Sequence, residues 1–437
     1  MRVSRDRTDV AGAAADAFVF GYPLVLSDRI RAWLSAVPAP DPATMKAPPN
    51  TFVHARRLPG PTAALAPDRH ADTLRSSAWL DLAHGPIALS VPATHGRFYA
   101  LSLVDAWTNV FGAVGVRTTG GRAGTFAITG PRWAAWSPPS GVQPIAAPTR
   151  MVRIAGLTAV DAEGCAPARA VQDGYGLAPL GSRTAPPETP LADRTPPRQQ
   201  LEGMPARVFF AELARLMRDN PPSSDDGPMV ERIHRLGMPA GEDGWEQLAG
   251  DLRRAVERGA ELGLERVLAA AESPPGEPVG GWHLRLHSGR HGTDYLRRAS
   301  AAYAGLEAGP AEDELPALTS TDADGNPLTG HHRYLLRFPP SDPPPVHGFW
   351  TLTTYDDRQG LVDNPVDCYS IGDWNGLIVD ADGSLLIHIR HRRPEGDQRL
   401  NWLPAPPGRF NLLLRLLWPQ DALLDRRWTP PAVVRAD

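Results

Sequence analysis

The chain has 437 residues, of which 42% are hydrophobic and 22% charged, and its formal net charge is −4. This length suits two or three domains that need no metal or disulfide to hold a core together. The 45 basic and 49 acidic residues form no basic stripe, which argues against nucleic acid as a partner.

The cysteine count and the apolar runs predict a cytoplasmic protein with no membrane partner. Cys165 and Cys368 are too few for a disulfide framework. The first residues lack the apolar region of a secretory signal, and no apolar run reaches the roughly 18 residues of a membrane span. The sequence leaves homo-oligomerisation open.

The first part of the chain predicts a short helix followed by strands. Apolar residues at helical spacing over Asp9–Leu26 predict an opening helix, interrupted at the Gly-Tyr-Pro of residues 21–23. Beyond it, Gly and Pro separate short apolar or alternating runs, which are typical of a β-sandwich or barrel. These runs are Ile87–Val91, Arg97–Val104, Thr125–Thr129 and Met151–Ala155.

The middle of the chain predicts a linker and then helices. Residues 179–205 are rich in Pro, Thr, Ala and Arg, which favours a linker or a surface excursion. Apolar faces at three- and four-residue spacing then predict helices over Ala206–Arg218, Glu242–Ala271 and Thr293–Leu306.

Strands return in the last part of the chain, after a turn at Asp322–Leu328. The predicted strands are Tyr334–Phe338, Gly348–Tyr355, Leu377–Asp380, Ser384–Arg390 and Phe410–Trp418. The predicted fold class is therefore α+β, mainly β, with two β-sandwich or barrel-like domains and a helical segment between them. The expected divisions are an N-terminal β domain over 1–178, the linker over 179–205, the helical segment over 206–310 and a C-terminal β domain over 311–437.

Segments in both β parts resemble one bacterial family of two-domain proteins. In the N-terminal part, the motifs that begin at Phe20, Asn50, Asp72 and Asp105 are similar to the domain of unknown function 1254. In the C-terminal part, the matching motifs resemble the domain of unknown function 1214; they begin at Tyr295, Asp324, Phe349, Asn364, Tyr369, Asp382, Asn401 and Arg415. The resemblance implies β-rich domains flanking helices and no agreed activity.

This chain departs from the family pattern at several polar positions. His70 stands where the family usually shows Asn, and Arg75 where it usually shows Tyr. Cys368 replaces a common Arg, and Leu417 replaces a common Tyr. These departures suggest an altered pocket and a different substrate.

The first candidate site is the polar cluster around residue 70. His70 and Asp72 share one face of an extended chain, so the carboxylate can orient the imidazole as a general base. We assign His70, Asp72 and Arg75 to a predicted catalytic group, with Arg75 or Arg117 holding an anion. The alternative is a surface loop in which Asp72 caps a turn.

The second candidate site is the strand end at residues 105–109. Asp105, Trp107 and Asn109 share one face if the chain is extended, and an aromatic wall beside a carboxylate suits a pocket. Asp105 is predicted as a catalytic acid or orienter, and Trp107 and Asn109 as substrate-binding. An equally favoured alternative makes Trp107 a core residue and gives Asp105 and Asn109 to a turn.

Aromatic residues extend the predicted binding site into the C-terminal part. The chain has 12 Trp, and aromatic walls recognise flat, apolar or sugar ligands. The predicted substrate-binding residues are Arg117, Trp350, Tyr355, Tyr369 and Trp402, although a Trp in a strand is more often part of the core.

His283, His287 and His291 recur at the four-residue spacing of helical zinc ligands. Glycines at 289 and 292 interrupt any helix there, so we assign no metal ligand. The chain has no nucleophile elbow, no phosphate-binding loop and no dinucleotide fingerprint, and we expect no organic cofactor.

Three functions follow as hypotheses. The first is an enzyme without an organic cofactor that performs acid/base chemistry of the lyase, isomerase or hydrolase type on a small organic metabolite. The second is a non-catalytic module that binds a carbohydrate or an apolar ligand. The third is a metal-dependent enzyme that uses the histidines at 283–291.

Overall fold

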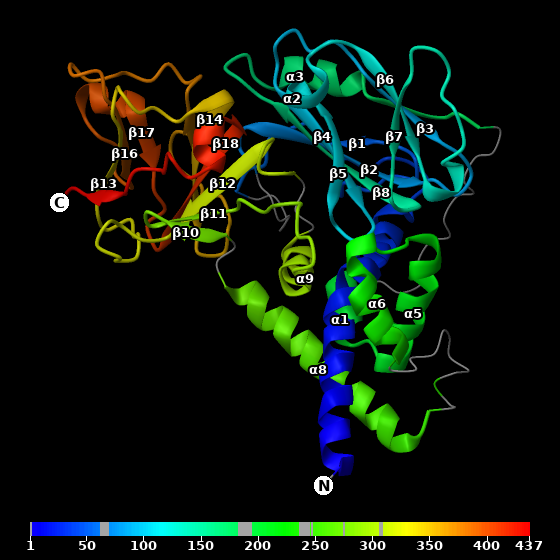
Figure 1. Cartoon of the computed structure of the whole chain (residues 1–437). Coiled ribbons are helices and arrows are strands. Elements are labelled where there is room, and N and C mark those ends of the chain that lie inside the picture. Colours follow the sequence, from blue (N-terminus) through cyan, green and yellow to red (C-terminus); the bar gives the residue numbers. More distant parts are fainter. Residues whose placement is uncertain are drawn as a thin grey trace.

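The computed structural model describes residues 2–61, 70–181, 195–235, 245, 248–273, 276–305 and 309–437. Figure 1 shows two β units side by side, with most of the helices gathered beneath the N-terminal unit. The described sheets are antiparallel in most of their pairings, and none of them closes into a barrel. The predicted α+β fold, mainly β, is confirmed, and each β unit is a sandwich.

The N-terminal unit is a sandwich of two sheets. The five-stranded sheet has the order β1 (Val53–His54), β2 (Thr73–Asp81), β8 (Met151–Ala159), β4 (Tyr99–Asp105) and β5 (Val110–Gly115). The four-stranded sheet has the order β7 (Gln143–Ala146), β6 (Gly124–Thr129), β3 (Ile87–Val91) and β9 (Gly176–Pro179). Leu80, Leu101 and Ile128 meet in the core between them, as expected for facing sheets whose side chains alternate inward and outward.

The C-terminal unit is a second sandwich. Its six-stranded sheet has the order β10 (Glu277–Val279), β11 (Trp282–Leu284), β12 (Glu314–Thr319), β18 (Phe410–Pro419), β14 (Val346–Asp356) and β15 (Ser370–Gly372). The second sheet has the order β17 (Trp402–Pro404), β16 (Leu385–Arg390), β13 (Tyr334–Phe338) and β19 (Val434–Arg435). The core between the sheets contains Leu336, Ile387 and Leu414.

Most of the described helices form one layer under the N-terminal sandwich. They are α1 (Arg2–Ser35), α4 (Pro197–Glu202), α5 (Ala206–Asp219), α6 (Gly227–Arg235), α8 (Gly250–Glu272) and α9 (Tyr295–Ala304). The other described helical elements are α2 (Val116–Thr119), α3 (Cys165–Asp173), α10 (Asp421–Leu424) and the 3-10 turns Pro131–Trp133, Ser224–Asp226 and Gly396–Asn401. The layer packs on the five-stranded sheet through Trp79 and Met151, which share an apolar cluster with α1, α5, α8 and α9. The opening helix thus packs with the helices of the middle segment.

Within the described residues, Val10–Ser35 of α1 is long and apolar enough to cross a membrane, and 78% of its most apolar window is buried inside the protein. A helix in the core of a protein can pass the same test of length and composition as a membrane span.

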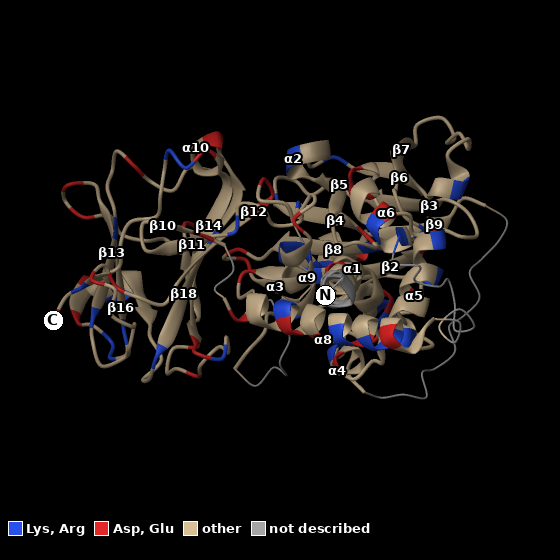
Figure 2. Ribbon diagram, turned by 60° about the horizontal axis from the view of Figure 1, so that its bottom comes forward, with Lys and Arg blue, Asp and Glu red and all other residues tan. Residues whose placement is uncertain are grey.

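Figure 2 shows basic and acidic residues interspersed along α8 and α5, without a stripe of one sign in that view.

The opening helix and one strand differ from the sequence-based expectation. Helix α1 extends to Ser35 and continues through Pro23, because complete burial of Tyr22 and Leu24 offsets the cost of about 3 kcal/mol for a proline inside a helix. The predicted strand Leu377–Asp380 is wrong, since this segment makes only an isolated bridge from Val379 to Leu385.

The middle of the chain also differs from the expectation. Residues 195–205 of the predicted linker include α4, and residues 206–310 include strands β10 and β11, which join the C-terminal sheet. Helices α5 and α9 match their predicted positions within two residues at each described end. The first residues of the helix predicted from Glu242 lie outside the described residues, and α8 itself begins at Gly250.

Candidate active site

The predicted residues around position 70 lie at the junction of the two sandwiches, next to Arg415. Arg415 is fully buried in β18, and its Nε donates to Glu314 Oε1 at 2.6 Å. Its Nη1 donates to the Asp72 carboxylate, whose second oxygen accepts from the Thr351 hydroxyl. Although burial opposes the charge, Asp72 and Glu314 raise the pKa of Arg415 above its ordinary value.

His70 belongs to the same junction but faces Glu314, with 3.9 Å between His70 Nε2 and Glu314 Oε1. The Asp72 carboxylate binds Arg415 and Thr351 across the interface. Arg75 is half-buried in β2 opposite Leu157, and its carbonyl accepts from Gln172. The junction cluster of His70, Asp72, Glu314, Thr351 and Arg415 therefore joins the two sandwiches through buried charges.

Asp105 forms a turn with Asn109, as the alternative prediction for this strand end has it. Its Oδ1 accepts from the backbone amides of Trp107 at 2.8 Å and Asn109 at 2.9 Å. Desolvation raises the pKa of Asp105 to about 6, against the opposing effect of these hydrogen bonds. Trp107 is buried, and its Nε1 donates to the Asn220 carbonyl at 3.1 Å. The geometry gives these residues a structural role.

The remaining predicted binding residues are spread over the C-terminal sandwich and the junction. Arg117 donates to Asp313 at 2.6 Å and so links α2 to the C-terminal unit. Trp350 packs on Phe338 in the C-terminal core, and Tyr355 is buried in the same strand as Trp350, β14.

Two further predicted binding residues make hydrogen bonds within the C-terminal unit. The Tyr369 hydroxyl donates to the Asp367 carboxylate at 2.6 Å. Trp402 is buried and donates to the Arg390 carbonyl at 2.8 Å. The structure does not bring these residues together in one pocket.

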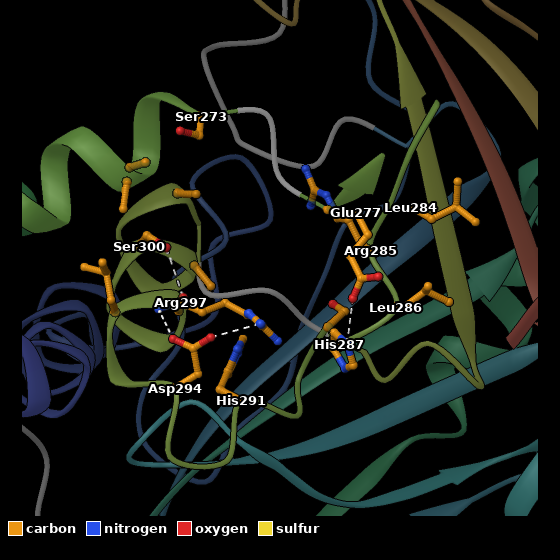
Figure 3. A pocket seen from close by; sticks show the side chains of 17 residues that line it. Ser273, Glu277, Leu284, Arg285, Leu286, His287, His291, Asp294, Arg297 and Ser300 are labelled. Carbon is orange, nitrogen blue, oxygen red and sulfur yellow. Dashed lines mark hydrogen bonds and ion pairs between the residues drawn. The ribbon is translucent and has the colours of Figure 1, made fainter. Parts of the chain in front are cut away.

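A cavity of about 480 Å³ opens elsewhere, between the end of α8, strands β10 and β11, and helix α9. Figure 3 shows its lining side chains, with His287 and Glu277 on one side and His291, Asp294 and Arg297 on the other. The volume is within the usual range for small-molecule sites, roughly 300–1,000 Å³. None of the predicted catalytic or binding residues lines this cavity.

His287 forms a pair with a carboxylate on the cavity wall. Its Nε2 lies 2.8 Å from Glu277 Oε1 (Figure 3). Glu277 is the first residue of β10, and its other oxygen pairs with Arg426. Because Glu277 engages one ring nitrogen, the Nδ1 of His287 is the atom available to a bound molecule. A carboxylate in this position orients an imidazole for proton transfer.

His291 lies across the cavity in a different state. Its side chain is only 5% exposed, and neither ring nitrogen has a hydrogen-bond partner within the part of the chain that the structure describes. Burial first, and the positive charges of Arg298 and Arg297 second, lower the pKa of His291 to about 4. The ring is therefore neutral at pH 7 and offers one donor and one acceptor. Buried polar atoms without partners are rare, which distinguishes His291 among the residues that line the cavity.

The start of α9 completes the polar lining. Asp294 caps the helix by accepting from the Arg297 backbone amide at 3.1 Å. Its carboxylate also lies 2.9 Å from the Arg297 guanidinium. Arg285 lines the cavity from the segment that follows β11. Two arginines, two carboxylates and two histidines thus surround a space bordered by the alanines of α8 and α9.

The three histidines do not form a metal site. His283 lies in β11 between Trp282 and Leu284, so its side chain points to the opposite face of the strand from these two buried residues. Of the three, His287 and His291 line the cavity. No group of three or more His, Cys, Asp or Glu side chains is placed to hold a metal ion among the described residues.

The fold and these sites define an α+β protein of two β-sandwiches with a helical layer and a polar cavity at its edge. Residues 49–179 match the family model of the protein of unknown function DUF1254, and residues 313–421 match that of DUF1214. The chain belongs to the family of proteins that combine these two domains. The cavity lies between the two matched segments along the chain, over residues 270–304.

A solved structure shows the same overall fold. The VPA0106 protein from Vibrio parahaemolyticus superposes with a TM-score of 0.74 at 20% sequence identity, covering 98% of this chain and 100% of that one. An uncharacterised protein from Burkholderia cenocepacia gives a TM-score of 0.47 at 12% identity, covering 99% of this chain and 94% of that one. A search of the curated proteins found no match.

Sequence reasoning missed the residues that complete these sites. Glu277 is ten positions before His287, and neither its residue type nor that spacing marks it in the sequence. The histidine spacing did signal His287 and His291, although as zinc ligands. Arg415 lies in a segment that carries the family resemblance, which was the available signal for it.

Proposed function

We propose that this chain is an enzyme that performs acid/base chemistry, without an organic cofactor, on a small polar organic molecule held in the cavity between α8, α9 and β10–β11. The observation that supports this most is the His287–Glu277 pair on the cavity wall, at 2.8 Å. The reaction class is the one expected from the sequence, but its residues are different.

The proposed first step is a proton transfer from the substrate to His287 Nδ1. The electron pair of the broken bond stays on the substrate, and Glu277 stabilises the imidazolium that forms. His291 is neutral and donates a hydrogen bond to the oxygen on which charge develops, which is worth most in a buried site. If the proton returns to another atom of the substrate, the reaction is an isomerisation. If the substrate instead loses a leaving group, the reaction is an elimination of the lyase type.

Arg285 and Arg297 suit the proposed substrate because they add positive charge to the lining. Arg297 is already paired with Asp294, so the substrate it favours is polar and carries at most a modest negative charge. Small oxo acids, hydroxy acids and lactones have this character, and each has a carbon-bound proton beside a carbonyl or carboxyl group that a general base can remove when the developing charge is stabilised.

The proposal is tested by hydrogen exchange in D₂O. The protein is incubated with a panel of oxo acids, hydroxy acids and lactones, and proton NMR follows the loss of carbon-bound protons. We expect exchange or turnover of at least one compound, reduced about 100-fold or more in His287→Gln, since general bases contribute roughly 10²–10⁴. The exposed His331 provides the control His331→Gln, which retains full activity.

A second function, binding without catalysis, is favoured by the openness of the site. The His287 side chain is 49% exposed, which gives a general base less protection from water than most active sites provide. Saturation-transfer NMR on the same panel separates the two functions. A compound that binds the wild type but not Arg297→Ala, with no exchange and no turnover, would establish a binding module. Exchange that persists unchanged in His287→Gln would refute the proposed base.

A further inference from the structure

A second cavity, of about 200 Å³, lies where the two sandwiches meet, and no step of the proposed reaction involves it. Its walls are largely aromatic. Phe98, next to β4, meets Phe349 of β14 edge to face, with ring centroids 5.7 Å apart. Phe349 also lies against Trp374, at 4.2 Å between ring centroids. Trp418 closes the wall beside His347, at 5.1 Å. We refer to this space as the aromatic cleft.

The backbone at the aromatic cleft departs from regular strand geometry. The pairing of β14 with β18 shifts between Val346 and Phe349, so that His347 and Gly348 together face Trp418. Such a bulge redirects side chains, and bulges are frequent next to binding sites. A Cβ at Gly348 would lie 2.6 Å from the Leu417 carbonyl oxygen, so this close approach requires glycine.

Trp418 itself adopts a left-handed backbone conformation, with φ of 51°. A bulky residue in this region is uncommon and costs on the order of 1–3 kcal/mol. Both Trp418 and Trp374 are only partly buried, so the core does not cover the whole surface of either indole ring. The strained backbone at Trp418 thus lies at the aromatic cleft, where the indole rings of Trp374 and Trp418 line the cavity.

The charges beside the cleft leave no net positive charge. Arg97 lies 2.9 Å from Asp161 and 3.6 Å from Glu163, and it also donates to the Ala159 carbonyl at 2.9 Å. Its guanidinium is therefore neutralised by two carboxylates. The cleft offers aromatic faces and edges without net positive charge, so its charges do not favour a carboxylate or phosphate.

We propose that the aromatic cleft binds one small, flat, uncharged aromatic molecule of a single or fused ring. The volume supports this size, because an apolar cavity of about 150 Å³ is known to hold a benzene molecule. Offset or edge-to-face contacts with Phe349, Trp374 and Trp418 supply the affinity. The site combines residues from both sandwiches, so its occupant also bridges the two domains.

Indole is the probe for the test, and ligand-observed NMR and calorimetry are the measurements. We expect indole to bind the wild type and to bind Trp374→Ala at least tenfold more weakly. Val116→Trp fills the cleft from α2 and leaves the aromatic wall residues in place, and we expect it to abolish binding. Trp33→Ala removes a half-buried indole on α1, far from the cleft in sequence, and serves as the control with unchanged affinity. Thermal denaturation shows whether each variant is folded.

Related compounds separate the alternatives. Indole-3-carboxylate tests charge and cyclohexanol tests flatness, and both should bind at least tenfold more weakly than indole. Equal binding of cyclohexanol, or tighter binding of indole-3-carboxylate, would overturn the proposed ligand class. Indole affinity that is unaffected by Val116→Trp in a folded variant, or no binding of indole at millimolar concentration, would overturn the site.

Discussion

The carboxylate of Asp105 accepts two backbone hydrogen bonds in its own turn, yet its desolvation dominates and raises its pKa from 3.8 to about 6. Between these two values the folded state binds the proton more tightly than the unfolded chain does, so the Asp105 contribution to stability falls as the pH rises through this window. Asp105→Asn keeps an acceptor and removes the titration. We therefore expect the variant to gain stability relative to the wild type from pH 4 to pH 7, by at most about 3 kcal/mol at 1.36 kcal/mol per pKa unit.

Urea denaturation of both proteins at several pH values between 4 and 7 measures this difference. Asp219→Asn is a suitable comparison, because Asp219 pairs with Arg132 and Arg150 at partly exposed positions. A free-energy difference between Asp105→Asn and the wild type that stays constant over the pH range would contradict the expected titration.

Residue patterns in the sequence located the candidate site residues only in part. The spacing of His287 and His291 marked both positions, but the partner of His287 depends on the hairpin, whose first strand brings Glu277 beside the end of the second. Asp72 was interpreted as the orienter of His70, because alternation places both on one face. The structure instead presents Asp72 to Arg415, a residue 343 positions away. Local periodicity carries no information about such a contact.

Helices α1 and α8 approach each other so closely that glycine is required at the crossing. A Cβ at Gly259 would lie 2.6 Å from the Ala11 carbonyl oxygen and 2.5 Å from the Ala14 Cβ. We expect Gly259→Ala to destabilise the protein by about 1–3 kcal/mol, since overpacking against backbone cannot be relieved by a rotamer change. Denaturant unfolding measures the effect.

Gly12 offers the matched control on α1 itself. Nothing lies within 4 Å of a Cβ built at Gly12, so Gly12→Ala should be neutral or stabilising by up to about 1 kcal/mol through helix propensity. Equal effects of the two substitutions would show that propensity alone, and not the α1–α8 contact, determines stability there.

Elements with a strong local pattern were predictable, and those that depend on distant contacts were not. The strands Ile87–Val91 and Tyr334–Phe338 match β3 and β13 at both ends, because apolar runs bounded by turn residues define them. Strands β10 and β11 are three residues long; β11 pairs with β12, and β10 pairs with β11 at the sheet edge. No alternation can be recognised in so short a segment, and both lie in a stretch expected to be helical.

The two sandwiches are joined by buried charge as well as by apolar contact. Arg415 is fully buried between Asp72 of one unit and Glu314 of the other. Arg415→Met leaves both carboxylates without their counter-charge, and removal of one partner from a buried ion pair typically costs about 3–5 kcal/mol. We expect this loss in denaturant unfolding. Arg337→Met, which breaks an exposed pair with Asp382, should cost at most about 1 kcal/mol.

The same substitution tests whether the molecule unfolds as one unit. In the wild type we expect tryptophan emission and far-ultraviolet circular dichroism to report a single transition, because the junction cluster couples the two apolar cores. In Arg415→Met the transitions should separate, since Asp72 and Glu314 then repel across the interface. The combined variant Arg415→Met/Asp72→Asn/Glu314→Gln removes every buried charge of this group, and it should restore a large part of the stability. If the triple variant is no more stable than Arg415→Met, the charges are not what joins the two sandwiches. The aromatic contact of Phe98 with Phe349 and the Arg117–Asp313 pair would then carry the coupling.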